Sequence, residues 1–231
     1  MDISYKRFNL KKEKPGRIQT KSSTMASKSG AREEWSFKTH FVGIIFGIAA
    51  TIWLWMRFSG APSFVIFGLS IIALYTCSSV YHYYNGPEDI LIRLRKLDHS
   101  MIYVLIAGTY TPVLANILPM PKGAIFLAVM WIVAAAGIII KVAWLDAPRL
   151  LYTSMYIFMG WSILVEPSAL GLMDPRCLGF LIAGGVSYTI GAVMYILKKP
   201  DITEEFGFHE LFHCFILLGT IFHFIGIAFF I

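Results

Sequence analysis

Long apolar runs alternate with short polar breaks along the chain from Phe37 onward. A run of about 20 mostly apolar residues is long enough to cross a bilayer as a helix. Pro, Gly and charged residues at the breaks end one helix before the next begins. The pattern therefore predicts an all-α membrane protein with seven transmembrane helices, at about 37–56, 63–84, 99–118, 123–142, 150–167, 176–197 and 207–230, the fifth being the shortest.

The first 34 residues differ from the rest, because they are polar and rich in Lys and Ser and show no sustained apolar periodicity. This composition predicts a basic, disordered cytoplasmic tail (1–34) that can touch anionic lipid, followed by one membrane domain (35–231). The polar stretch is too long for the n-region of a signal peptide, and no small-residue cleavage site follows it. We therefore expect the first helix to be retained.

Composition narrows the class of protein. Of the 231 residues 57% are hydrophobic and 15% charged, which excludes a soluble globular domain. The net charge of +6 is not a nucleic-acid signature, because nine of the 20 Lys and Arg residues lie in the first 32 and the others fall mostly in short loops. The three cysteines are isolated and are expected to pack as small apolar residues rather than to form disulfides. No soluble cofactor is indicated.

The basic residues predict the orientation. With the N-terminus inside, 17 of the 20 Lys and Arg residues fall on the inner side, against Arg57, Lys122 and Arg176 outside. This is a strong positive-inside signal. Seven spans then place the C-terminus outside, which is opposite to the orientation of G-protein-coupled receptors. The last span also lacks the lysine that a retinal protein would need.

The last predicted helix carries three histidines, His209, His213 and His223, in an otherwise apolar sequence. At about 100° per residue they fall on one narrow stripe of the helix. Histidine in a membrane span is costly unless it faces protein, a cavity or a metal ion. The i,i+4 pair is spaced to reach one ion, although two imidazoles that only pack or hydrogen-bond would show the same spacing.

Further polar residues fall at the same depth once the orientation is set. The second helix ends on the inner side in Ser78-x-x-x-His82, whose two named residues share a helix face, and the third begins there with Asp98. Three neutral imidazoles and a water match the ligand set of a catalytic zinc site. We therefore expect Zn²⁺ to be bound near the cytoplasmic face by His82, His209 and His213.

Asp98 and Ser78 are the candidate catalytic residues. Zinc lowers the pKa of a bound water towards about 7. Asp98 would hydrogen-bond that water or act as general base, and Ser78 would orient it or stabilise the developing oxyanion. Two alternatives stay open: Asp98 could cap its helix or pair with Arg95 or Lys96, and Ser78 could bond back to its own helix.

The other histidines are given no metal role. His223 lies about 15 Å deeper along the last helix than His213, too far to share an ion, and is expected to make a buried hydrogen bond or line a cavity. His40 is expected to make a structural hydrogen bond. His99 is rotated about 100° from Asp98 and is expected to face a loop or to lie behind the site.

These motifs together resemble the hemolysin III family, which belongs with the progestin and adipoQ receptors and the alkaline ceramidases in a proposed hydrolase superfamily. The residues that carry the resemblance are Ser78-x-x-x-His82, the segment 97–112 with Asp98, and His209-x-x-x-His213, and Glu34-x-x-x-x-Thr39-His40 fits the entry to the first helix. In the family the matching Ser, Asp and three His form a shared polar set, and adiponectin receptors hold zinc through the three His. The resemblance covers the chain from about Glu33 to the end. It implies seven helices, an inside N-terminus and a zinc site near the cytoplasmic face.

The resulting hypothesis is a multi-pass protein of the bacterial cell membrane that hydrolyses a lipid amide or ester with zinc. A lipid substrate would enter sideways from the inner leaflet. The family label makes a membrane-perturbing cytolysin the first alternative, although no amphipathic pore-forming segment supports it. A sensor or receptor with structural zinc is the second. The substrate, the oligomeric state and the identity of the divalent ion stay open, because three His ligands suit several metals.

Overall fold

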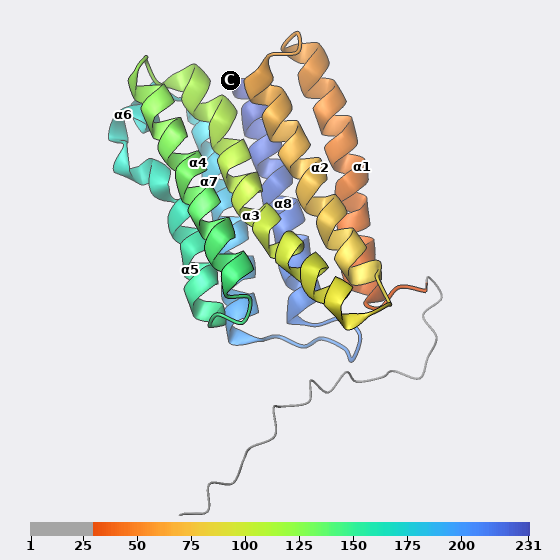
Figure 1. Cartoon of the computed structure of the whole chain (residues 1–231). Helices are drawn as coiled ribbons and strands as arrows, with labels where there is room; N and C mark the ends of the chain where they lie inside the picture. Colours follow the sequence, from red (N-terminus) through yellow and green to blue (C-terminus); the bar gives the residue numbers. More distant parts are fainter. Residues whose placement is uncertain (1–29) are drawn as a thin grey trace, which may run out of the picture.

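The structure is a computed structural model that describes residues 30–231, so most of the predicted tail at 1–34 lies outside the described residues. The described chain is all-helical (Figure 1). Its elements are α1 (Glu34–Arg57), α2 (Pro62–Tyr83), α3 (Glu88–Ile117), α4 (Lys122–Ala143), α5 (Arg149–Gly160), the 3₁₀ helix η1 (Ser162–Val165), α6 (Pro167–Leu172), α7 (Pro175–Leu197) and α8 (Phe208–Phe230).

Six of these helices, α1, α2, α3, α4, α7 and α8, are long and apolar enough to cross a membrane. Proline or glycine near their ends sets several of the boundaries. Pro62 and Pro175 each begin a helix at its first position, where the missing N–H costs nothing. The prediction of an all-α, multi-pass membrane protein is confirmed. The inside placement of the N-terminus stays a prediction.

The fifth predicted span is interrupted. Helix α5 has 12 residues, about 18 Å, which is shorter than the roughly 30 Å hydrocarbon core of a bilayer. The chain then turns through η1, so α5 and η1 occupy the place of the expected helix at 150–167, and α6 begins where that helix was expected to end. Pro167 begins α6, and the preceding Glu166 side chain accepts a hydrogen bond from the Ser168 backbone N–H. Proline cannot continue a helix, and the acidic cap starts a new one.

Helix α3 is longer than predicted. It begins at Glu88 rather than near residue 99 and has 30 residues, or about 45 Å. Its first third carries charged residues and runs obliquely past the end of α2 (Figure 1). Asp98 is therefore an interior residue of a helix and not its first turn, but it remains near the end of the bundle where α1 begins.

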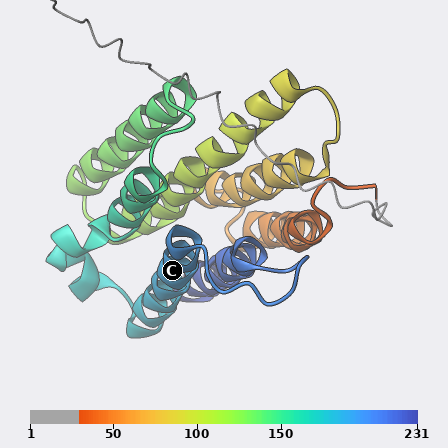
Figure 2. The same ribbon diagram turned by 90° about the horizontal axis from the view of Figure 1, so that it is seen from below.

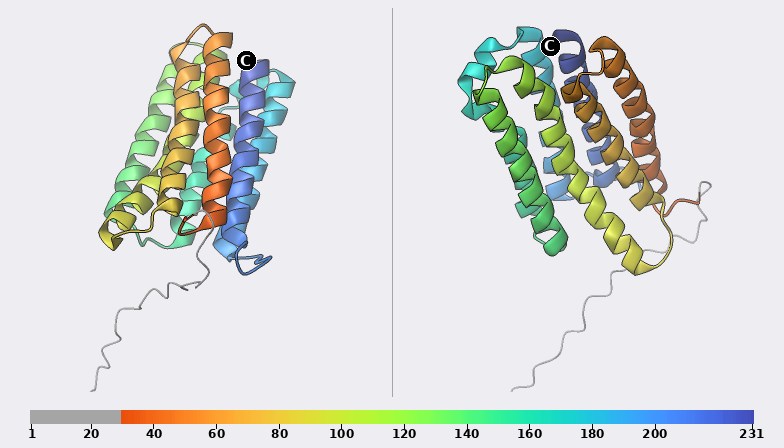
Figure 3. Two further views of the ribbon diagram at one scale, coloured as in Figure 1. Left: turned by 90° about the vertical axis from the view of Figure 1, so that its right-hand side faces the viewer. Right: turned by 45° about the horizontal axis from the view of Figure 1, so that its top comes forward.

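The helices pack around a common centre (Figure 2). Along one side α1 packs on α2, α2 on α3 and α3 on α4, while α7 packs on α8 and α8 returns to α1. Helix α5 contacts α7, α3 and α4. The axes of the long helices are roughly parallel, and successive helices run in opposite directions (Figure 3). The starts of α1, α3 and α8 and the end of α2 share one end of the bundle, called the N-terminal end below, and the C-terminus lies at the other (Figure 1).

Glycine allows a close contact between α1 and α2. The Tyr75 ring of α2 lies against Gly43 of α1, where an added Cβ would lie 2.3 Å from Tyr75 Cδ1. Tyr75 is fully buried, and its hydroxyl lies 2.8 Å from Thr220 Oγ1 of α8. One side chain thus ties α1, α2 and α8 together. Gly43 and Gly47 therefore serve packing within this chain, which is the close helix contact that small residues permit.

Candidate metal centre

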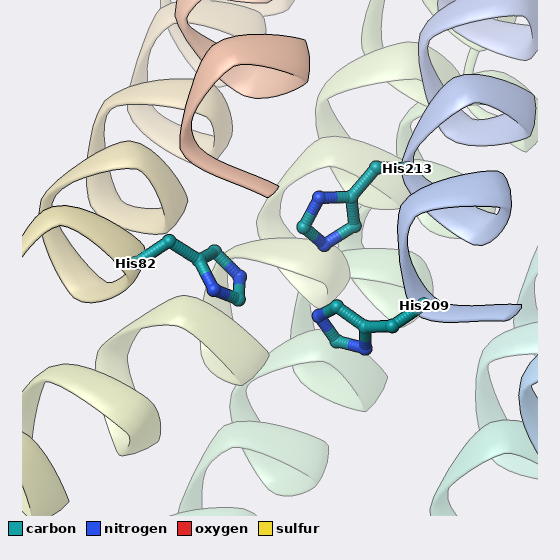
Figure 4. Close-up of side chains that lie close together, drawn as sticks. All are labelled: His82, His209 and His213. Carbon is teal, nitrogen blue, oxygen red and sulfur yellow. The ribbon is translucent and has the colours of Figure 1, made fainter. Parts of the chain in front are cut away.

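Three imidazoles converge at the N-terminal end of the bundle (Figure 4). His82 comes from the last turn of α2, and His209 and His213 come from the first turns of α8. One ring nitrogen of each lies within 4.8 Å of one from each of the others. His82 and His213 are buried and His209 is half-buried. The spacing within α8 and the packing of α2 beside it thus bring the three predicted ligands together.

The Nδ1 atoms of His82 and His213 contact Glu33, which directly precedes α1, and Thr39 of α1. His82 Nδ1 donates a hydrogen bond to the Glu33 carboxylate, which also pairs with Arg32. Thr39 Oγ1 lies 3.4 Å from His213 Nδ1 and donates its own hydrogen to the carbonyls of the preceding turn. The threonine oxygen is therefore the acceptor for His213 Nδ1–H.

The Glu33 carboxyl stays ionised. Burial raises its pKa, but the hydrogen bond from His82 and the nearby positive charge of Arg32 help to outweigh this effect, and the pKa falls to about 2. A carboxylate that accepts the far N–H of an imidazole fixes its tautomer and leaves Nε2 as the lone-pair nitrogen. Sequence reasoning missed Glu33; its only signal was an acidic pair directly before the first apolar run.

The three histidines fit a metal ion. Among the described residues, the Nε2 atoms of His82 and His209 are buried without any hydrogen-bond partner. An unpartnered buried nitrogen is costly, and because His82 Nδ1 donates its hydrogen to Glu33, Nε2 carries the lone pair. Imidazole binds zinc at about 2.0–2.1 Å, so nitrogens within 4.8 Å of one another reach a single ion after small ring rotations.

Asp98 and Ser78 lie beside the cluster and line the same cavity as His209 and His213. The Asp98 carboxylate lies 3.5 Å from His99 Nδ1 and forms no ion pair with Arg95 or Lys96 within residues 30–231. The Ser78 hydroxyl is next to Asp98 but makes no hydrogen bond that meets normal geometry. The cap, ion-pair and back-bonding alternatives for these two residues are thus not what the structure shows.

The remaining histidines differ from one another. The His40 ring stacks on His213 at 3.6 Å between centroids, yet neither of its nitrogens has a hydrogen-bond partner in the described chain, so the expected structural hydrogen bond is wrong. His99 is a buried residue of α3 that lines the cavity rather than a loop; its Nδ1 donates to Arg95 O at 2.8 Å. His223 Nε2 donates to Leu181 O at 3.1 Å and lines the cavity, as expected.

A mostly apolar cavity leads from the cluster into the bundle. It extends along α8 from His209 to His223, about 20 Å of helix. Its walls come from α3, α5, α7 and α8, with apolar side chains that include Leu105, Ile106, Val113, Ile157, Leu181 and Ile216. Its charged carboxyl group, Asp98, and the ligand residues His209 and His213 lie at the N-terminal end. Such a space suits a ligand with a long apolar chain and a polar group at one end.

Comparison with known proteins identifies the family. The profile of Haemolysin-III related proteins matches residues 30–224, most of the chain. The chain belongs to the hemolysin III family. Hemolysin-3 of Bacillus cereus is 34% identical over 201 residues, covering 84% of this chain and 89% of that protein. The Hemolysin-3 homolog of Bacillus subtilis (strain 168) is 34% identical over 191 residues, covering 79% and 86%.

This hemolysin III protein is also similar, at lower identity, to two animal proteins. The adiponectin receptor protein of Drosophila melanogaster is 26% identical over 217 residues, covering 82% of this chain and 48% of the receptor. The human monocyte to macrophage differentiation factor is 26% identical over 170 residues, covering 70% and 67%. Together with its six membrane-length helices, the bacterial relatives show that this is a multi-pass bacterial membrane protein.

Proposed function

We propose that this hemolysin III protein is a zinc-dependent hydrolase of a lipid amide or ester. The observation that supports the proposal most directly is the opening of a buried three-histidine cluster onto a long apolar cavity that Asp98 and Ser78 also line. A lipid placed there would hold its chain among apolar side chains and its carbonyl near the histidines. The bilayer is the source of the substrate.

Each residue has a separate task in this proposal. His82, His209 and His213 hold the ion, which when bound supplies Lewis-acid polarisation of a carbonyl and acidification of water. Asp98 takes a proton from the attacking water and returns it to the leaving nitrogen or oxygen as the C–N or C–O bond breaks. The Ser78 hydroxyl, which has no partner in the described structure, donates to the carbonyl oxygen as negative charge develops on it.

Metal content of detergent-purified protein, measured by mass spectrometry, is the first test. We expect about one zinc per wild-type chain, a loss in His82→Ala and His209→Ala because two imidazoles hold the ion poorly, and no loss in His223→Ala. A well-folded wild type without stoichiometric metal would refute the hydrolase.

Turnover of lipid amides and esters is the second test. With zinc retained, Asp98→Asn should lower kcat by about 10²–10⁴-fold, the usual worth of a general base. If removing zinc unfolds the bundle and no lipid is turned over, the protein is instead a sensor with structural metal. Dye release from vesicles that persists after metal removal would favour membrane lysis, which the name of the Bacillus cereus relative describes.

A further inference from the structure

Two tyrosines meet where the cavity reaches the N-terminal end of the bundle. Tyr152 of α5 and Tyr195 of α7 both line the cavity, and their hydroxyl oxygens lie 3.2 Å apart. In such a pair one hydroxyl donates to the other, so one O–H remains free to donate. The described chain supplies no acceptor for it.

Each tyrosine ring carries a cation on its face. Lys141 Nζ lies 3.7 Å from the centroid of the Tyr152 ring, and Arg149 Cζ lies 4.2 Å from that of Tyr195. Lys141 donates to Leu145 O and Arg149 to Tyr195 O, each at 2.8 Å. Neither cation forms an ion pair with any carboxylate of residues 30–231.

This arrangement is costly unless an anion completes it. Lys141 is only 1% exposed, whereas Arg149 is half-buried. The carboxylate whose charge acts on Lys141, that of Asp146, is itself exposed and pairs with Arg95 instead. A buried cation so weakly matched loses its hydration without full compensation. A neutral amide or hydroxyl headgroup would leave both charges unmatched. An anion beside the tyrosine hydroxyls would accept a hydrogen bond from the free O–H. It would also be attracted by the two cations, which lie on the faces of the same two rings.

The position of the tyrosines defines what kind of anion fits. The Tyr195 ring centroid lies 5.7 Å from that of His209, so an anion at the hydroxyls would be a few bonds away from a carbonyl at the metal centre. Two unmatched cations suit a group of charge near −2. A phosphate monoester carries about −1.5 to −2 at pH 7, whereas a carboxylate carries −1.

We propose that Tyr152, Tyr195, Lys141 and Arg149 form a headgroup subsite for an acyl lipid that ends in a phosphate monoester. The inference rests on the proposed function, because it names the class of substrate for the same cavity. The acyl chain would extend towards His223, and the scissile carbonyl would lie between the phosphate and the histidines.

The test compares binding of three single-chain lipids that share one acyl chain: lysophosphatidic acid, lysophosphatidylcholine and monoacylglycerol. The full chain with Asp98→Asn is titrated in detergent, and binding is followed by tryptophan fluorescence and native mass spectrometry. We expect lysophosphatidic acid to bind at least about tenfold more tightly than the others, as one charge-assisted hydrogen bond would provide. Arg149→Gln and Lys141→Met should remove this preference.

Two controls separate the subsite from general attraction to a basic surface. Arg149→Lys keeps the charge and should keep most of the preference, and this comparison with Arg149→Gln remains decisive if Lys141→Met does not fold. The exposed Lys198 and Lys199 follow α7 at the same end of the bundle, and their joint change to Gln should leave the preference intact. Equal binding of the three lipids, or an equal loss in the Lys198/Lys199 variant, would overturn the proposal. So would inorganic phosphate that competes as well as the lipid.

The outcome is independent of the hydrolase test. A phosphate preference in binding without any turnover in the wild type would keep the subsite and reject the hydrolase. Hydrolysis of neutral lipids without a phosphate preference in binding would support the hydrolase and reject the subsite.

Discussion

At the scale of single residues, the centre depends on Glu33 as much as on its histidines. The Glu33 carboxylate accepts from His82 Nδ1 and so directs Nε2 towards His209 and His213. Glu33→Gln should weaken zinc binding by about 10–100-fold, the usual effect of losing a carboxylate behind a metal-binding imidazole. Competition with a chelator of known affinity measures it.

The neighbouring acid provides the matched control for that prediction. Glu34 pairs with Lys38 along α1 at the protein surface, so Glu34→Gln should leave zinc affinity unchanged. Equal losses in the two variants would show a general effect of negative charge rather than orientation of His82.

The ligand histidines could be predicted because their signals are local. The i,i+4 spacing places His209 and His213 on one helix face. The predicted spans place His82 at the inner end of the second helix, which is the membrane depth at which the last helix begins. Glu33 could not be predicted in this way, because it is 49 residues from His82 and meets it only through the packing of α1 on α2. The cation-bearing tyrosines Tyr152 and Tyr195 likewise meet across 43 residues.

At the scale of elements, hydropathy predicted helices well where apolar residues fill the whole span. It missed the first third of α3, since charged residues there lower the hydropathy although the backbone remains helical. It also merged α5 and η1 into one span, because the sequence through Trp161 is still apolar, and it missed α6, which Glu166 and Pro167 begin. Helix length and continuity thus depended on caps and turns more than on hydrophobicity.

The contact of α1 with α2 gives a prediction at this scale. Gly43→Ala places a Cβ 2.3 Å from Tyr75 Cδ1, and Tyr75 cannot move freely because its hydroxyl is bonded to Thr220. We expect the free energy of unfolding in detergent to fall by about 1–3 kcal/mol, as for other overpacked cores. Thermal unfolding of the purified protein is the measurement.

An exposed glycine of α7 is the control for that contact. An added Cβ at Gly179 would meet nothing within 4 Å, and alanine favours a helix more than glycine does. Gly179→Ala should therefore unfold at the same temperature or slightly higher. A Gly43→Ala protein that behaves like the Gly179 variant would mean that the two helices can separate without loss.

At the scale of the whole molecule, the site and the two chain ends are related by geometry. The three histidines share the N-terminal end of the bundle with the start of α1, and the C-terminus lies at the opposite end (Figure 1). The 17-to-3 distribution of Lys and Arg predicts that the N-terminal end faces the cytoplasm. The metal centre would then draw on the inner leaflet.

Reporter fusions test this orientation. Alkaline phosphatase is active only outside the cytoplasm and green fluorescent protein fluoresces mainly inside it. Fused after Ile231, the phosphatase should be active and the fluorescent protein dark, and fused in the loop between α2 and α3 at Gly86 the results should be reversed. Surface loops and chain termini are sites that tolerate insertion. Fluorescence at the C-terminal fusion would place the histidines at the outer leaflet, and the lipid substrate would then have to come from the outer side.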